Sequence, residues 1–238
     1  MQKYKKNYDY SYALGTELTL ELLKNYPEEV RMVYVHSRQN NNEIFAQVKG
    51  LCEKNHIEMI YSDKAFNIVN AKENCYLMGV FNKFSNPIRP DSNHVVLVNP
   101  SNMGNLGTII RTMTGFGIND LAIIEPAADI YDPKVVRASM RAFFSLRFSL
   151  FDSWEAYLNS VEERNIYPFM LDGKTRLQDI KIPERYSLVF GNEATGLPAQ
   201  FHDYGESVFI EQLNTIDSLN LDNAASIGIY EFTKGKVK

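Results

Sequence analysis

The feature that most constrains the fold is the alternation of apolar, strand-length runs with helical segments after residue 93. The apolar runs lie at residues 94–99, 121–125, 143–151, 166–171, 187–190 and 207–210. The helical segments lie at residues 108–117, 133–140 and 153–164, and a last helix follows residue 220. Strand, crossover helix and strand in repetition predict an open parallel sheet with helices on both faces.

The first part of the chain shows the same alternation on a smaller scale. Helical patterns occupy residues 14–25, 44–54 and 63–69, and strand patterns occupy residues 31–36, 57–61 and 76–81. Alternation within so short a stretch predicts a small α/β layer domain. Residues 85–93 contain two prolines and several turn-forming residues, so we place the domain boundary there, with domains at 1–88 and 89–238.

The N-terminal residues interleave lysines with tyrosines. Lysine stands at positions 3, 5 and 6, and tyrosine at positions 4, 8, 10 and 12. Basic residues interleaved with aromatics are able to hold RNA phosphates and stack on bases. A solvated tail whose tyrosines pack on the domain is the alternative, and we favour it slightly.

Charge, cysteine and histidine content and hydropathy argue against several classes of protein. The chain has 238 residues and a net charge of −4, which argues against a protein coated in positive charge but not against a local basic groove. Cys52 and Cys75 have no metal or redox spacing, which indicates a reducing compartment. The four histidines are scattered, so no metal is expected. No pattern of a signal peptide or membrane span is found, and we expect a cytoplasmic protein.

Polar loops follow three of the predicted strands, and open α/β sheets bind ligands at such carboxyl ends. In the first loop, Gly104 and Gly107 permit tight turns and close approach of a ligand. Asn105 lies near the start of the next helix, and Arg111 lies within its first two turns. The glycine spacing fits neither G-x-G-x-x-G nor G-x-x-x-x-G-K-[ST], which disfavours dinucleotide binding and nucleotide hydrolysis.

The second loop contains Gly191, Asn192, Glu193 and Gly196 directly after a buried strand. An acidic residue between glycines at a strand end is hard to explain by packing. A plain turn with a solvated glutamate is the alternative. We favour a ligand site.

The third loop leads into the last helix and carries Ser218, Leu219 and Asn220. Its polar side chains lie where the N–H groups of a helix start are unpaired. Ile210 and Leu219 are able to sandwich a flat ring while Ser218 and Asn220 supply polar contacts. Helix capping alone would explain one polar residue, not the group.

In chain order, the three loops contain N-x-G-x-x-x-R at residues 105–111, GNEATGL at residues 191–197 and SLN at residues 218–220. These motifs resemble those of the SpoU (TrmH) family, the RNA ribose 2′-O-methyltransferases of the SPOUT superfamily. The resemblance covers residues 95–232 and implies a Rossmann-like half, a deep C-terminal trefoil knot, S-adenosylmethionine as methyl donor and an obligate homodimer. The first domain resembles the L30e-like substrate-binding domain that often precedes this catalytic domain.

Carried over residue by residue, the resemblance implies three sets of roles. The cofactor would contact Leu171, Gly191, Asn192, Gly196, Ile210 and Leu219. The catalytic residues would be Asn105, Arg111, Glu193, Ser218 and Asn220. RNA would contact Arg111, Arg137 and Arg141. An arginine is effectively never deprotonated in proteins, so two roles stay open for Arg111, that of a phosphate clamp and that of the base.

Three residues depart from the family pattern. Arg141 follows a matching Arg-Ala-Ser segment but stands where many members have glycine. Asp222 stands where members have a small residue, and Glu211 stands where proline is usual. None of them replaces a motif residue, so we still expect catalysis. We expect these three residues to change how the RNA substrate fits the site.

The sequence therefore predicts an S-adenosylmethionine-dependent RNA 2′-O-methyltransferase. Ribosomal RNA is the first choice of substrate, because the L30e-like extension recurs in members that modify it, and tRNA is the near alternative. A non-catalytic RNA-binding or assembly protein on the same fold is an alternative of another class. A dinucleotide-dependent oxidoreductase is disfavoured by the glycine spacing.

Overall fold

The computed structural model describes residues 1–69, 74–213 and 215–235 and divides into two compact units. Unit 1 comprises Met1–Ser85 and Asp129–Ser145, and unit 2 comprises Asn86–Ala128 and Leu146–Lys238. The break after residue 85 falls close to the boundary placed between residues 88 and 89. Residues 129–145, which the sequence assigns to the second domain, group with unit 1 instead.

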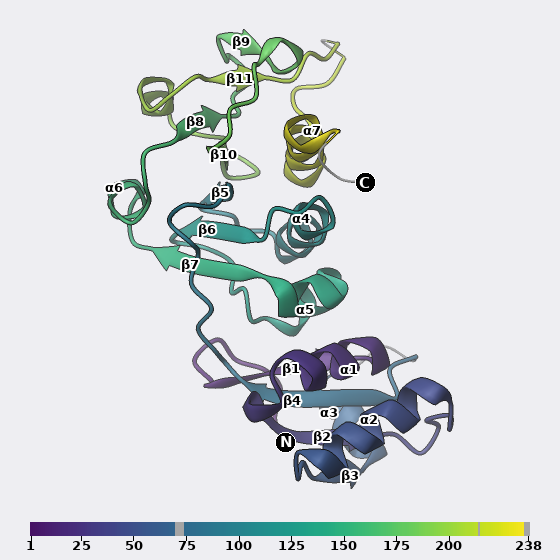
Figure 1. The fold of residues 1–238 in the computed structure, drawn as a ribbon. Coiled ribbons are helices and arrows are strands. Elements are labelled where there is room, and N and C mark those ends of the chain that lie inside the picture. Colours follow the sequence, from purple (N-terminus) through teal and green to yellow (C-terminus); the bar gives the residue numbers. More distant parts are fainter. Residues whose placement is uncertain (70–73, 214, 236–238) are drawn as a thin grey trace. The chain divides into compact units, whose positions relative to one another are not determined.

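Unit 1 contains a four-stranded mixed sheet in the order β1-β4-β2-β3 (Figure 1). Its strands are β1 (Tyr10–Leu14), β2 (Val30–Val35), β3 (Met59–Tyr61) and β4 (Leu77–Asn82). Strand β4 pairs antiparallel with β1 and β2, whereas β2 and β3 are parallel. Strands β2, β3 and β4 lie where the sequence predicts strands.

Strand β1 lies where the sequence predicts a tail and the start of a helix. Ser11 and Tyr12 are buried, and the Ser11 hydroxyl donates to the Tyr131 carbonyl at 2.5 Å. The rings of Tyr8 and Tyr10 stack with centroids 5.1 Å apart. A solvated tail is therefore wrong for residues 10–14, although the tyrosines do pack on the unit. The neighbouring lysines obscured the two-residue period of this strand.

The helices of unit 1 are α1 (Thr16–Asn25), α2 (Glu43–Lys54) and α3 (Asp63–Ile68), with a 3₁₀ turn η1 (Pro27–Glu29) after α1. Helix α2 starts after Asn42, whose side chain accepts a hydrogen bond from the Phe45 N–H at 2.9 Å. Leu20, Phe45 and Val48 pack with strand residues in one apolar cluster. The predicted helices are confirmed, and their apolar faces form the core of the unit.

Residues 129–145 contain helix α5 (Pro133–Ala138) and the 3₁₀ segment η2 (Met140–Ser145). Phe143 and Phe144 are buried, and the Phe81 ring lies 6.2 and 5.6 Å from theirs. The predicted strand at residues 143–151 is therefore wrong in its first part, because these two aromatic residues pack from a helical turn. Strand β7 begins at Arg147.

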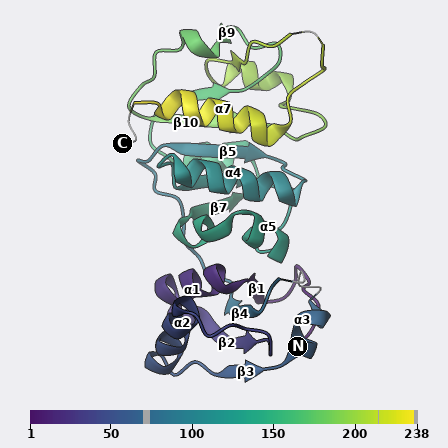
Figure 2. The ribbon, with the colours of Figure 1, turned by 90° about the vertical axis from the view of Figure 1, so that its right-hand side faces the viewer.

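Unit 2 is built on a five-stranded parallel sheet in the order β7-β6-β5-β10-β8. Its strands are β5 (His94–Val98), β6 (Asp120–Ile124), β7 (Arg147–Phe151), β8 (Asn165–Pro168) and β10 (Tyr186–Phe190). Helices α4 (Met103–Gly115) and α7 (Leu221–Thr233) cover one face and α6 (Trp154–Asn159) the other (Figures 1 and 2). The predicted parallel sheet with helices on both faces is confirmed.

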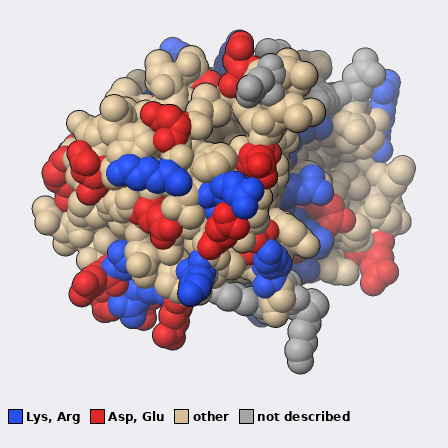
Figure 3. Space-filling view, turned by 90° about the horizontal axis from the view of Figure 1, so that it is seen from above, with Lys and Arg blue, Asp and Glu red and all other residues tan. Residues whose placement is uncertain are grey.

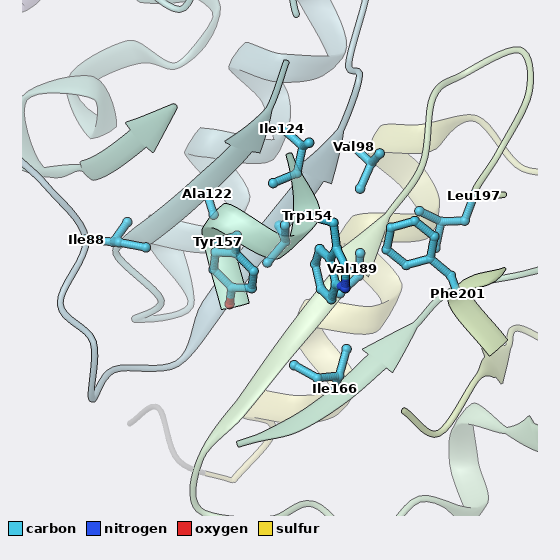
Figure 4. Close-up of a cluster of buried hydrophobic side chains, with 11 residues drawn as sticks. Ile88, Val98, Ala122, Ile124, Trp154, Tyr157, Ile166, Val189, Leu197 and Phe201 are labelled. Atoms are coloured by element: carbon cyan, nitrogen blue, oxygen red, sulfur yellow. The ribbon is translucent and has the colours of Figure 1, made fainter. Parts of the chain in front are cut away.

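The three central strands carry the core of unit 2. Every residue of β5, β6 and β10 is buried, as continuous apolar runs in a doubly covered parallel sheet require. Figure 4 shows Val98, Ile124 and Val189 of these strands packed with Trp154 and Phe201. This packed layer holds the carboxyl ends of the strands in place along one edge of the sheet.

Beyond this sheet, β9 (Thr175–Arg176) pairs in parallel with β11 (Val208–Phe209). Two 3₁₀ turns, η3 (Leu177–Asp179) and η4 (Ala199–Asp203), complete the region. The predicted strands at 166–171 and 207–210 are real but shorter, and β9 is too short to give a sequence signal. The trefoil knot stays a prediction, because strand order and register do not determine threading.

Candidate functional site

The order of the strands predicts where unit 2 binds a ligand. Strands β5, β6 and β7 run outward in one direction, and β10 and β8 lie on the other side of β5. Open parallel sheets bind ligands at the carboxyl ends of the strands where the order reverses. Strands β5 and β10 are neighbours at this point, with Leu97 opposite Phe190. Their loops, residues 99–102 and 191–197, leave the sheet side by side.

Glu193 links these two loops. Its carboxylate accepts hydrogen bonds from the Ser101 N–H at 3.0 Å, the Ser101 hydroxyl at 2.7 Å and the Asn102 N–H at 3.0 Å. Partial burial, the largest single influence, raises the pKa of the Glu193 carboxyl, but these hydrogen bonds together hold it below its usual value. Glu193 is therefore an ionised acceptor that fixes loop geometry. Sequence reasoning missed Ser101 and Asn102.

Asn105 extends this network to the third motif. Its side-chain amide donates to Glu193 and to Asn220, both at 3.4 Å. Asn220 caps helix α7, and its side-chain oxygen also accepts from the Leu221 N–H at 2.9 Å. Helices α4 and α7 pack along their length, with the hydroxyls of Thr112 and Ser226 3.3 Å apart. The structure thus brings one residue of each motif into a single hydrogen-bonded group.

The loop after β10 is shaped by Asn192 and two glycines. The Asn192 amide donates to the Asn99 carbonyl at 2.8 Å, and its oxygen accepts from the Ala194 N–H at 2.9 Å. A Cβ at Gly191 would lie 2.2 Å from the carbonyl carbon of Gly196, and Gly196 has a φ of 67°. The turn therefore needs glycine at both positions.

A cavity of about 430 Å³ opens beside this loop. Its lining includes every residue predicted to bind the cofactor, namely Leu171, Gly191, Asn192, Gly196, Ile210 and Leu219. Ser218 and Glu193 also line it. Sequence reasoning missed Phe169 and Phe190, whose rings stack with centroids 4.4 Å apart, and Asp172. A volume of this size with a largely apolar wall suits a drug-sized ligand with a flat ring.

Arg111 lies apart from these contacts. It is exposed on α4 and, among the described residues, makes no hydrogen bond or ion pair. It does not line the cavity, and neither do Asn105 and Asn220. The structure therefore leaves the guanidinium of Arg111 available for a group from outside the chain.

Arg137 and Arg141, the other predicted RNA contacts, belong to unit 1. Arg137 is half-buried near the end of α5. Arg141 is exposed, with its guanidinium 3.9 Å from the Glu21 carboxylate. Both arginines therefore belong to a different unit from the loops that carry the three motifs.

The two departures in the last quarter of the chain have different surroundings. Glu211 accepts a hydrogen bond from Gln178 at 2.9 Å and lies 3.6 Å from the Arg176 guanidinium, so it joins a surface cluster beside β9. Asp222 lies in the first turn of α7, where a negative charge is favourable. One of its oxygens is buried without a hydrogen-bond partner among the described residues.

Metal and membrane features were searched in residues 1–69, 74–213 and 215–235. No group of three or more His, Cys, Asp or Glu side chains there is placed to hold a metal ion. No helix in that part of the chain has the length and apolar character needed to cross a membrane. Cys52 and Cys75 are free and buried, and burial raises the pKa of each thiol to about 11.

Comparison with known proteins identifies relatives by sequence. Residues 92–230 match the SpoU rRNA Methylase family. The 23S rRNA (uridine(2479)-2'-O)-methyltransferase of Streptomyces viridochromogenes is 32% identical over 161 residues, covering 63% of this chain and 55% of that protein. The tRNA (cytidine(34)-2'-O)-methyltransferase of Saccharophagus degradans is 29% identical over 142 residues, covering 58% of this chain and 92% of that protein. The chain thus spans little more than half of the first relative.

A solved structure extends the likeness to both units. The AdoMet-bound rRNA methyltransferase of Sinorhizobium meliloti matches with a TM-score of 0.82, covering 97% of this chain and 89% of that one. Sequence identity is 21%, so this likeness establishes the fold alone. The resemblance predicted from the three motifs is confirmed by the match over residues 92–230, and the chain belongs to the SpoU rRNA Methylase family.

Proposed function

We propose that the chain transfers a methyl group from S-adenosylmethionine to a ribose 2′-hydroxyl of RNA, with ribosomal RNA as the substrate. The observation that carries this proposal is the hydrogen-bonded group of Asn105, Glu193 and Asn220 beside the cavity. One residue of each family motif meets there. The names of the family and of the sequence relatives support RNA 2′-O-methylation.

The cavity fits the cofactor by size and by lining. Stacked Phe169 and Phe190, with Ile210 and Leu219, offer an apolar wall for the adenine ring. The missing Cβ of Gly191 lets the backbone of Gly196 pack directly against it, and this tight turn forms part of the cavity wall. Leu171, Asn192 and Gly196 complete the proposed binding set. When bound, S-adenosylmethionine supplies the methyl group.

The residues of the chain contribute mainly by positioning. Methyl transfer is an in-line displacement, so much of the acceleration comes from holding the 2′-oxygen in line with the methyl carbon. Asn105, Glu193, Ser218 and Asn220 orient this arrangement. Glu193 is ionised and already accepts three strong hydrogen bonds, which favours an orienting role over that of a base. Arg111 clamps the RNA phosphate and activates the hydroxyl.

Ribosomal RNA is favoured over tRNA by the extent of the matches. The tRNA enzyme of Saccharophagus degradans aligns over 92% of its length but over only 58% of this chain. The 23S rRNA methyltransferase of Streptomyces viridochromogenes aligns over 63% of this chain. We assign the L30e-like domain at residues 1–88 to RNA binding, with help from Arg137 and Arg141, and catalysis to the SpoU domain at residues 89–238.

RNA binding has to come from individual basic side chains rather than from total charge, which is −4. Figure 3 shows Lys and Arg side chains interspersed with Asp and Glu on the face that it draws. Interspersed charges favour local contacts with phosphates over attraction by a uniformly positive surface. Arg111 is a candidate for such a local phosphate contact, because its guanidinium has no hydrogen-bond or ion-pair partner among the described residues.

We propose a homodimer in which two chains build the RNA site. Ile227 and Tyr230 of α7 are 41% and 54% exposed, and the Tyr230 ring meets that of Phe116, the residue after α4, with centroids 5.9 Å apart. Exposed apolar and aromatic side chains on a packed helix pair are typical of an interface. Light scattering at assay concentration tests this, and a monomer would contradict a composite site. The cytoplasm is the proposed compartment, in keeping with two free cysteines.

The test of function is transfer of label from S-adenosylmethionine carrying a radioactive methyl group to RNA. Purified protein is incubated with total RNA from cells that lack it, and the ribosomal and transfer fractions are then separated. We expect label in ribosomal RNA at a ribose 2′-oxygen. Label in the tRNA fraction instead would show that the substrate is tRNA and not ribosomal RNA. Measurable RNA binding without any transfer would favour a non-catalytic binding protein.

A further inference from the structure

A tight turn presents two side chains at the edge of the cavity. The Gly173 N–H donates to the Met170 carbonyl at 3.1 Å, which closes a turn with Leu171 and Asp172 at its centre. Both line the cavity, and both are exposed, Leu171 to 69%.

The turn is held from both sides. The Met170 N–H donates to the Val208 carbonyl at 2.9 Å, and the Lys174 N–H donates to the Ser207 carbonyl at 3.0 Å. A Cβ at Gly173 would lie 2.5 Å from the Val208 carbonyl carbon, so the turn packs directly on the backbone of β11. The position of Asp172 is therefore fixed by the backbone.

The side chain of Asp172 contacts one histidine. Its carboxylate lies 3.1 Å from His202 Nε2, and His202 Nδ1 lies 3.0 Å from the Ser207 hydroxyl. The order Ser, His, Asp resembles a hydrolytic triad. Ser207 is fully buried, however, so no substrate reaches its oxygen. The exposed member of the three is Asp172, whose side chain is 76% exposed, so any group that binds here meets the carboxylate and not the serine.

The charges of the cavity single out this carboxylate. Asp172 and Glu193 are the acidic residues of the lining, which contains no Lys or Arg among the described residues. Glu193 is occupied by Ser101 and Asn102. A carboxylate has about four acceptor positions, and the His202 contact uses one of those of Asp172.

We infer that Asp172 accepts hydrogen bonds from a donor group of the cofactor, either the ribose hydroxyls or the α-ammonium, and that His202 is a positioning residue that aims it. The inference rests on the proposed function. It adds a residue of the chain that reads the polar end of S-adenosylmethionine, beside the apolar residues that hold the ring.

Calorimetric titration of the full-length protein with two ligands tests the inference. S-adenosylhomocysteine has the ribose hydroxyls and the ammonium, whereas 5′-methylthioadenosine has the hydroxyls alone. Asp172→Asn should weaken S-adenosylhomocysteine binding about ten- to hundredfold, the usual effect of losing a charge-assisted hydrogen bond. An equal loss with methylthioadenosine assigns the hydroxyls, and a loss confined to S-adenosylhomocysteine assigns the ammonium.

The control is Asp179→Asn. Asp179 is an exposed carboxylate of the same unit that pairs with Arg176 at 2.9 Å and does not line the cavity. We expect this variant to bind both ligands within about twofold of the wild type, inside the range of surface changes. The inference fails when Asp172→Asn, folded as judged by its melting temperature, binds both ligands as tightly as Asp179→Asn does.

His202→Gln separates a positioning role from an independent one. We expect it to weaken the same ligands as Asp172→Asn, by a smaller factor, and to add nothing in the double variant. Additive losses would contradict the assignment of His202. A wild-type protein that binds no S-adenosylmethionine would refute the proposed function, whereas binding by the wild type with an unaffected Asp172→Asn refutes this inference alone.

Discussion

Replacing Glu193 by glutamine tests whether one carboxylate holds the two central loops of the site together. The carboxylate accepts from Ser101 at 3.0 and 2.7 Å, from the Asn102 N–H at 3.0 Å and from the Asn105 amide at 3.4 Å. A glutamine keeps one acceptor oxygen and places an NH₂ group at the other position. At least one N–H of the loop after β5 then faces another donor.

The size of the effect follows from these contacts. A hydrogen bond to a charged group contributes about 1.5–3 kcal/mol, and an orphaned buried donor costs about 1–3 kcal/mol. Glu193 is only half-buried, so water and screening reduce both figures. We expect Glu193→Gln to lower the free energy of unfolding by about 1–2 kcal/mol at pH 7.

The effect should also depend on pH, with a sign that the structure fixes. Burial raises the pKa of the Glu193 carboxyl and the hydrogen bonds from Ser101 and Asn102 lower it, with a net pKa below the usual value. A carboxyl whose pKa is lowered in the folded state stabilises the fold at pH values above its unfolded-state pKa, which is about 4.3 for glutamate. This contribution is lost as pH falls through the folded pKa. The difference between wild type and variant should therefore be full at pH 7 and shrink below about pH 4.3.

Urea unfolding followed by circular dichroism measures the difference at several pH values. Glu163→Gln serves as the matched control, because Glu163 is exposed and outside the cavity. The reasoning about Glu193 is refuted when its variant is as stable as the control at pH 7. It is equally refuted when the stability gap stays constant down to pH 3.

Three further predictions concern single residues of unit 2. Arg111→Ala should abolish methyl transfer and leave S-adenosylmethionine binding within about twofold, because the side chain lies outside the cavity; an equal loss of cofactor affinity in a titration would contradict this. Gly191→Ala should lower the free energy of unfolding by about 1–3 kcal/mol through overpacking, while Gly115→Ala, with open space at its Cβ, should not. His94 is buried, and burial followed by the nearby Arg164 guanidinium lowers its pKa to about 4. The unfolded state binds the proton more tightly, so stability should fall by about 3 kcal/mol as pH drops from 6.5 to 4, measured by urea unfolding against a His94→Asn variant that lacks this titration.

The sequence predicted which loops lie side by side because parallel topology brings strand ends together. Asn105, Glu193 and Asn220 stand far apart in the chain, but each follows a buried strand or starts the helix after one. Once the strands are parallel, their loops share one edge of the sheet. The six predicted cofactor residues line one cavity for this reason.

Packing between distant segments was beyond the sequence patterns. The segment at residues 129–145 groups with unit 1 because Phe143 and Phe144 bury their rings against Phe81. Apolar content alone predicted a strand there, since aromatic residues favour strands when no packing partner is known. Strand β1 was missed for a related reason, because only its pairing with β4 removes Ser11 and Tyr12 from water.

The role of the group formed by Asp172, His202 and Ser207 follows from the exposure of its members rather than from their residue types. The same three side chains in the same spatial order form a nucleophilic triad elsewhere, where the serine meets the substrate. Here Ser207 is fully buried and Asp172 is the exposed member. The end of the group that faces solvent is therefore the aspartate and not the serine. An exposed carboxylate beside a cavity without basic lining residues among those described is suited to binding a cation or a hydroxyl. Burial, which only the folded chain defines, therefore turns an apparent catalytic group into a ligand-positioning one.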